Sequence, residues 1–234
     1  MKHSLKKNAL VVLIGAAALT GAGQASAEIQ GYAGLNLGWN ATELEQTVAA
    51  DEGGIAVTEE ASEAAHGVAF GSVAGLKLPI STGYLALEVN LEDSSAEAEQ
   101  EAMVNGAVTM KSSTTSNLSY GVTGILATSI NESTFLYGLA GYQMTDMELK
   151  YSDRNPVSGT VASDNSSETF GGFRVGAGVE TKLTHALSLR MEWSQTHYSS
   201  EEFAVNSALY DNGAQTIELE PVENRISIGV IGHF

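Results

Sequence analysis

Hydrophobic and polar residues alternate with a period of two along much of the chain, which is typical of a β-strand with two unlike faces. In residues 84–92, for example, Leu85, Leu87 and Val89 share one face, and Glu88 lies on the other. The five clearest stretches of this kind are residues 32–40, 84–92, 172–182, 187–195 and 225–234. In the last of them, Ile231 is an exception on the polar face. These stretches predict five strands.

Three weaker stretches fit the same pattern and bring the expected number of strands to eight. They cover residues 67–78, 117–129 and 134–147. In the third, the alternation predicts that Phe135, Tyr137 and Leu139 share the apolar face, although it blurs near Met144. Short and long connections should alternate between the eight strands. The short ones are residues 79–82, 130–133 and 183–186, and the long ones are residues 41–66, 93–116, 150–170 and 199–221.

A soluble β-sandwich also has one apolar and one polar face, so other features must decide between a sandwich and a membrane barrel. The expected strands are long enough to cross a bilayer, which takes about 9–11 tilted residues. No ionised residue interrupts the centre of any apolar face, and the polar faces are rich in glycine. Because an open sheet edge in lipid would leave backbone groups unpaired, the sheet must close. We therefore expect an all-β, eight-stranded antiparallel transmembrane β-barrel with four long acidic extracellular loops and three short periplasmic turns.

The first 27 residues resemble an export signal in their composition. Three lysines precede a short apolar segment, and Ala25 and Ala27 form an A-x-A cleavage site. The apolar segment is too short for an anchor helix, which needs about 20 residues. We therefore predict a signal peptide at residues 1–27 and a barrel domain at residues 28–234.

Composition and charge narrow the possible partners. The leader contains three of the 11 basic residues and none of the 28 acidic ones, so residues 28–234 carry a net charge of −20. Such a charge excludes binding to nucleic acid through its phosphates. The chain has no cysteine, and it contains no phosphate-binding loop or spaced metal ligands, so we expect no cofactor and no metal centre.

If the polar faces point inward, several charged side chains enter a lumen that eight strands make just wide enough for side chains to fill. These residues must pair, because isolated buried charges are costly. The predicted interior charge network consists of Glu88, Arg174, Glu180, Lys182, Arg190, Glu192 and Arg225, with Lys77 and Glu92 near its ends. The network would be a structural plug or, alternatively, the lining of a narrow ion channel.

The long connections hold most of the excess acid and few aromatic residues, as a solvated, mobile surface would. Hard oxygen ligands suit Ca²⁺ or Mg²⁺, so these loops could also bridge to anionic lipopolysaccharide through divalent cations.

The whole of residues 28–234 resembles the small outer-membrane β-barrels of the OmpA/OmpX-like and opacity type, best in "LSLRMEWSQTHY" and "NRISIGVIGHF". The resemblance implies export to the outer membrane of a Gram-negative bacterium, contact with its lipids and lipopolysaccharide, and recognition of Phe234 by the barrel-assembly machinery. Tyr84, Phe135 and Tyr137 would join Phe234 in an aromatic girdle at the periplasmic rim, with Trp39 and Phe173 at the outer rim.

One short motif raises the possibility of catalysis. His197 and Ser199 share a strand face, and Glu201 or Glu202 follows them. The motif is similar to the His-x-Ser-Asn of outer-membrane lipid A deacylases, but Ser200 stands where that family has asparagine. We therefore expect a structural or surface-exposed barrel protein without catalytic residues, with a porin-like channel and a lipid A hydrolase as alternatives.

Overall fold

The computed structural model describes residues 29–52, 55–104, 107–154, 159, 161–206 and 214–234. Nearly all of them lie in antiparallel β-strands, and none of the described residues forms a helix that could span a membrane. The strands are β1 (Gln30–Glu52), β2 (Ile55–Ile80), β3 (Gly83–Ser94), β4 (Glu97–Val104), β5 (Ala107–Ser129), β6 (Thr134–Arg154), β7 (Val161–Lys182), β8 (Leu187–Tyr198), β9 (Glu201–Asn206) and β10 (Ala214–His233).

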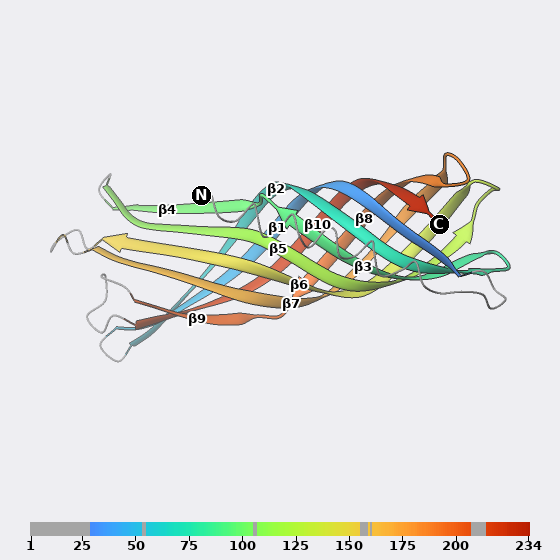
Figure 1. Ribbon diagram of the computed structural model, residues 1–234. Coiled ribbons are helices and arrows are strands. Elements are labelled where there is room, and N and C mark those ends of the chain that lie inside the picture. The colour runs from blue at the N-terminus through green and yellow to red at the C-terminus, as the bar shows by residue number, and fades with distance from the viewer. Residues whose placement is uncertain (1–28, 53–54, 105–106, 155–158, 160, 207–213) are drawn as a thin grey trace.

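The strands close into an antiparallel barrel in the order β1, β2, β3, β5, β6, β7, β8 and β10 (Figure 1). Closure comes from β1, which pairs with β2 on one side and with β10 on the other. Two barrel strands are interrupted, one between β3 and β4 and one between β8 and β9. Beyond the breaks, β4 continues the pairing with β5 and β9 continues the pairing with β10. The ten segments therefore make eight barrel strands, which confirms the predicted fold class.

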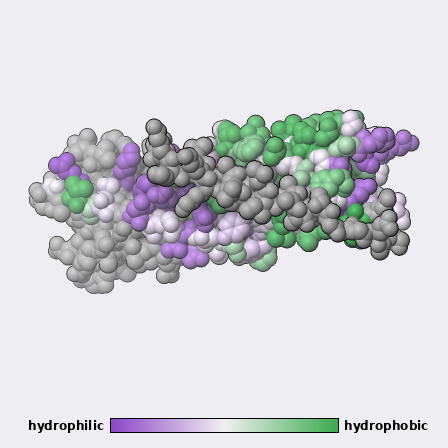
Figure 2. Space-filling model, viewed as in Figure 1, coloured by the Kyte–Doolittle hydropathy of each residue, from purple (hydrophilic) through white to green (hydrophobic). Residues whose placement is uncertain are grey.

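The predicted inversion of the usual protein interior is present. Aliphatic side chains of the alternating stretches point away from the barrel, and Leu87, Leu126 and Ile226 are 60%, 61% and 62% exposed. Figure 2 shows hydrophobic residues gathered, on the face in view, over the half of the barrel that carries the short turns. Such a band suits the hydrocarbon of a bilayer, because it would be costly to expose to water.

The short turns lie close to where the sequence placed them. Between β5 and β6, the Asn131 side-chain oxygen accepts the backbone N–H groups of Ser133 and Thr134, both at 2.9 Å. Between β7 and β8, the Thr184 hydroxyl accepts the N–H groups of Ala186 and Leu187. These side-chain acceptors satisfy backbone donors that the sheet leaves free.

The segments predicted as long loops are mostly strand, and that part of the prediction is wrong. β2 has 26 residues and β1 has 23, about twice what a membrane crossing requires. The excess extends beyond the apolar band as paired hairpins, seen at the left of Figure 1. The outward face of these hairpins meets water instead of lipid, so the apolar stripe of the membrane strands ends there although the hydrogen-bond ladder continues. The inward face stays packed in part, because Leu44, Ala65 and Ala96 form a buried cluster.

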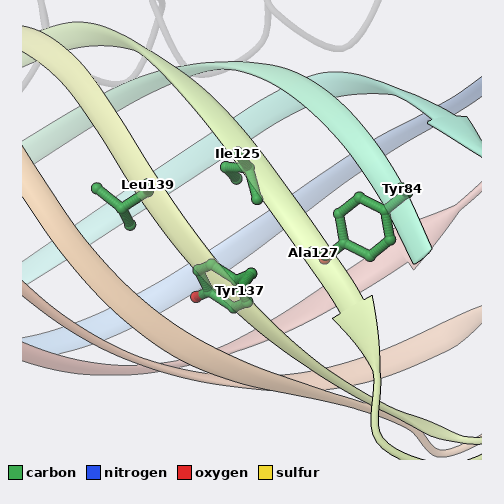
Figure 3. Close-up of a cluster of buried hydrophobic side chains, with 5 residues drawn as sticks. All are labelled: Tyr84, Ile125, Ala127, Tyr137 and Leu139. Atoms are coloured by element: carbon green, nitrogen blue, oxygen red, sulfur yellow. The ribbon is translucent and has the colours of Figure 1, made fainter. Parts of the chain in front are cut away.

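The expected face of residues 134–147 is also wrong. Tyr137 and Leu139 point inward and are 2% and 6% exposed, and they pack with Tyr84, Ile125 and Ala127 inside the barrel (Figure 3). Leu136 and Tyr142 face outward instead, along with small residues. Tyr84 and Tyr137 are therefore not part of a rim girdle, and half-buried Phe135 packs against this cluster. The prediction placed the larger residues of this strand on the outward face, whereas the larger residues are the inward ones.

Candidate functional site

A chain of ion pairs runs through the lumen of the barrel. The Lys77 ammonium contacts the Glu180 carboxylate at 2.5 Å, and the other oxygen of Glu180 lies 3.2 Å from the Arg190 guanidinium. Arg190 also contacts Glu88 at 2.5 Å. These four side chains come from β2, β7, β8 and β3, and each is at most 7% exposed. The chain of contacts therefore links opposite walls of the barrel.

Two further pairs continue the network toward the end of the barrel that carries the long hairpins. Arg174 donates to Glu192 at 2.7 Å and to the Gln143 side-chain oxygen at 3.1 Å. Arg225 forms an ion pair with Glu92 and donates to Asn36 at 2.8 Å. Buried ion pairs are tolerated when hydrogen bonds satisfy their remaining polar atoms, and these neutral amides contribute such bonds.

Three tyrosines complete the network. The hydroxyl groups of Tyr32, Tyr84 and Tyr137 donate to Glu88, Glu180 and Glu192 at 2.9, 3.1 and 2.8 Å. Aromatic faces also meet the cations, since Lys77 lies 4.4 Å from the Tyr84 ring centre and Arg190 lies 5.5 Å from the Tyr32 ring centre. A positive group over an aromatic face is stabilised by the ring quadrupole.

Glycine makes room for two of these rings. Gly75 is the cross-strand partner of Tyr32, and Gly178 is the partner of Tyr137. A Cβ atom on Gly178 would lie 2.3 Å from the Tyr137 ring, and one on Gly75 would lie 2.6 Å from the Tyr32 ring. The inward glycines of the sequence thus allow large side chains to cross a narrow lumen.

Six of the seven predicted network residues lie in this lumen, and Lys182 does not. Lys182 is exposed at the mouth beside the short turns, with its ammonium group 4.9 Å from the Phe135 ring centre. At the last position of β7 the barrel wall ends, so parity no longer determines burial. Lys77 and Glu92, which the sequence placed near the ends, are fully part of the network.

Sequence reasoning missed one charged interior residue, Glu223, which is 5% exposed. It follows an acidic segment and lies between the predicted loop at residues 199–221 and the predicted strand at residues 225–234, so neither of these predictions includes it. Parity could have found it, because Glu223 is two positions from inward-facing Arg225 on β10.

The lumen is closed at its centre and open at one mouth. A cavity of about 20 Å³, room for about one water molecule, lies among Asn90, Arg174, Arg190, Glu192 and Arg225. A vestibule of about 540 Å³ opens at the end with the short turns, with Lys77, Tyr84, Glu180 and His233 in its wall. The ion pairs therefore separate this vestibule from the other half of the barrel.

The sequence matches the model of the outer membrane protein β-barrel domain family over residues 9–233. The chain belongs to this family. It is accordingly an outer-membrane β-barrel protein of a Gram-negative bacterium. A 22 kDa outer membrane protein of Rhizobium leguminosarum bv. viciae is 33% identical over 95 residues, which span 41% of this chain and 37% of that protein.

One solved outer-membrane β-barrel shares the fold, and a second is similar at a lower TM-score. The outer membrane protease OmpT of Escherichia coli matches with a TM-score of 0.52 and 10% identity, over 92% of this chain and 99% of that one. The attachment invasion locus protein Ail of Yersinia pestis matches with a TM-score of 0.37 and 14% identity, over 88% of this chain and 99% of that one. The similarity to OmpT extends to the fold alone.

The His197 and Ser199 motif of this outer-membrane barrel is not arranged as a catalytic pair. The Nε2 atom of His197 hydrogen bonds with the Gln195 side chain at 3.0 Å. The Ser199 hydroxyl donates to the backbone oxygen of Gly171 at 3.1 Å. A serine nucleophile needs its hydroxyl hydrogen bonded to the base, and here that proton is directed elsewhere. Glu201 is exposed, and the Glu202 side chain lies outside the described residues.

The two ends of the chain bear on the remaining sequence predictions. Phe234 is 59% exposed, and its backbone exchanges two hydrogen bonds with Gly31 on the first strand. Its ring lies against Gly31, where a Cβ atom would come within 2.5 Å of it. The predicted cleavage residues Ala25 and Ala27 lie outside the described residues.

Proposed function

We propose that this outer-membrane β-barrel has a structural and surface-exposed role without catalysis, and that its lumen is kept closed by ion pairs. The observation that carries the proposal is the linked set of Lys77, Glu180, Arg190 and Glu88, which connects opposite walls. Breaking a buried pair costs about 3–5 kcal/mol, because the remaining charge is left uncompensated. A hydrated ion entering the lumen would have to overcome such a cost.

The partners follow from the two surfaces of the barrel. The apolar band would contact the fatty acyl chains of the outer membrane, and the hairpins beyond it would meet lipopolysaccharide. Divalent cations could bridge the acidic hairpins to its phosphates. The exposed Phe234 ring beside Gly31 would be available to the barrel-assembly machinery before the seam between β10 and β1 closes.

A narrow channel is the second candidate, and the vestibule of about 540 Å³ favours it, because it leads from one mouth to the ion pairs. Arg190 contacts two carboxylates, so an exchange of partners would be the step that opens the lumen.

Planar-bilayer recordings of the refolded protein test both candidates. We expect no discrete conductance steps from the wild type. The double variant Glu88→Ala, Arg190→Ala should conduct, because it removes a central ion pair together with its bulk, and it shows that the assay detects an open lumen. Reproducible steps from the wild type, altered by Arg190→Lys, would replace the structural role with the channel.

A further inference from the structure

Within the part of the barrel interior whose side chains the structure describes, there is one carboxylate more than the cations can balance. Among the described interior residues, five carboxylates face four cations. The carboxylates are Glu88, Glu92, Glu180, Glu192 and Glu223, and the cations are Lys77, Arg174, Arg190 and Arg225. Each of the first four carboxylates has a lysine or arginine within ion-pair distance.

Glu223 is the carboxylate without an ion pair among the described residues. Its side chain accepts one hydrogen bond, from Asn40 Nδ2 at 3.3 Å. Arg174 attracts it electrostatically, but Arg174 forms its ion pair with Glu192 instead. An ionised carboxylate that is 5% exposed needs a compensating positive charge close by.

The atoms around Glu223 have the composition of a cation site. Asn40 Nδ2 lies 3.2 Å from Glu92, 3.3 Å from Glu223 and 3.5 Å from the Ser94 hydroxyl, so one amide nitrogen with two protons faces three acceptors. Thr42 is the cross-strand partner of Glu223. These oxygen atoms come from β1, β3 and β10, three different walls of the barrel.

Two buried oxygen atoms at the same place have no hydrogen-bond partner. They are Asn40 Oδ1 and Thr42 Oγ1, on side chains that are 0% and 4% exposed. Buried polar atoms are rarely left unsatisfied, and an ion is one recognised reason for an exception. A half-turn of the Asn40 amide would exchange its nitrogen for Oδ1 at the point where the carboxylates converge.

We propose that Glu223, Glu92, Asn40, Thr42 and Ser94 form a binding site for a hard metal cation at the hairpin end of the charge network. The cation lies between the turned Asn40 amide and the carboxylates of Glu92 and Glu223 and takes only oxygen ligands, the type that Na⁺ and Ca²⁺ prefer. Arg225 already neutralises Glu92, so a single positive charge balances the remaining carboxylate. The site is independent of whether the barrel conducts.

Cation-dependent thermal unfolding tests the site. Refolded protein in dodecyl maltoside at pH 7.5 is titrated with CaCl₂ or NaCl, and choline chloride keeps the ionic strength constant. A saturating cation that binds only the folded state should raise the unfolding midpoint by ~2–4 °C. Glu223→Gln should abolish this rise. Glu43→Gln should retain it, because Glu43 is an exposed acid three positions from Asn40 on β1.

The comparison of the two salts identifies the ion, since a rise with one salt alone assigns the site to that cation. Equal rises in wild type and Glu223→Gln would overturn the proposal, because binding would then be at surface acids. If neither salt raises the unfolding midpoint of the wild type above its value in choline chloride, the proposal is also overturned. Glu223 would then be protonated rather than balanced by a cation.

A second variant keeps the test decisive if Glu223→Gln does not refold. Asn40→Asp adds a charged oxygen ligand at the same point, and affinity for Ca²⁺ rises with the charge of the ligand set. Isothermal titration with CaCl₂ should show at least a several-fold lower dissociation constant than in wild type. An unchanged constant would contradict the site.

Discussion

At the scale of single residues, the lumen depends on matched large and small side chains. Tyr32 faces Gly75 and Tyr137 faces Gly178 across neighbouring strands, and both hydroxyl groups end on carboxylates. Glycine weakens a strand because it has no side chain to pack. Here the facing tyrosine fills that space, so the pair restores the contacts that either wall would lack.

Gly178→Ala should therefore destabilise the barrel, although alanine is the smallest side chain that can replace glycine. Its Cβ would lie 2.3 Å from the Tyr137 ring and 2.5 Å from the backbone oxygen of Met191, which cannot both move away. We expect a loss of ~1–3 kcal/mol in the free energy of unfolding, as for other overpacked sites. Urea titration of the protein in lipid vesicles, followed by tryptophan fluorescence, measures it.

Gly138→Ala is the matched control for this variant. Gly138 is exposed on β6, and its added Cβ would meet nothing closer than a backbone oxygen at 3.9 Å. A Gly138→Ala variant as unstable as Gly178→Ala would show that loss of glycine itself, rather than crowding of the tyrosine, is responsible.

Residue identity also explains which parts of the site were predictable. Glu88, Arg190 and Glu180 were placed correctly because each alternates with aliphatic residues on a long, regular strand. Tyr137 was misplaced because a tyrosine carries an apolar body and a polar tip, so it fits either face. Glu223 was missed because it lies between the predicted loop and the predicted last strand, although its parity with Arg225 places it on the inward face.

At the scale of strands, each element has two environments, lipid outside and a packed polar lumen inside. In β3 the outward positions are leucine and valine, whereas Glu88, Asn90 and Glu92 point inward. The sequence predicted the membrane-crossing part of such strands because the two environments select different residues. It did not predict the hairpin extensions, because their outward side chains, such as Glu43 and Glu45, meet water instead of lipid and are no longer apolar.

Leu87→Arg tests the assignment of the outer solvent. Leu87 is 60% exposed at the middle of β3, and a charge there would enter hydrocarbon. We expect a loss of ~2–4 kcal/mol in the free energy of unfolding in lipid vesicles. Ser163→Arg, at an exposed position of the β7 extension, is the control and should change that free energy by less than ~0.5 kcal/mol. Similar losses for both variants would contradict a lipid-facing band at Leu87.

At the scale of the whole molecule, closure is what makes the fold possible in a membrane. The pairing of Tyr32 with His233 begins a ladder between β1 and β10 that continues to Ala50 and Gln215. No strand edge in the apolar band is then left without hydrogen-bond partners. Opening the barrel at any seam would expose a row of backbone groups to lipid at once, so unfolding should be strongly cooperative.

Cooperative closure predicts heat-modifiable migration in gel electrophoresis. Unboiled protein in dodecyl sulfate should stay folded and run at a different apparent mass from the boiled sample. Intermediate heating should show two bands that exchange intensity, with no smear between them. Identical mobility before and after boiling would contradict a stable closed barrel.

The pairing of the hairpins beyond the apolar band also restricts which mutations this surface can accept during evolution. A residue inserted into one arm would shift its register against the other and turn every later side chain to the opposite face. Changes of length should therefore be confined to the hairpin tips or occur in both arms together. Elsewhere, sequence variation should accumulate by substitution at every second position, where the side chain faces water.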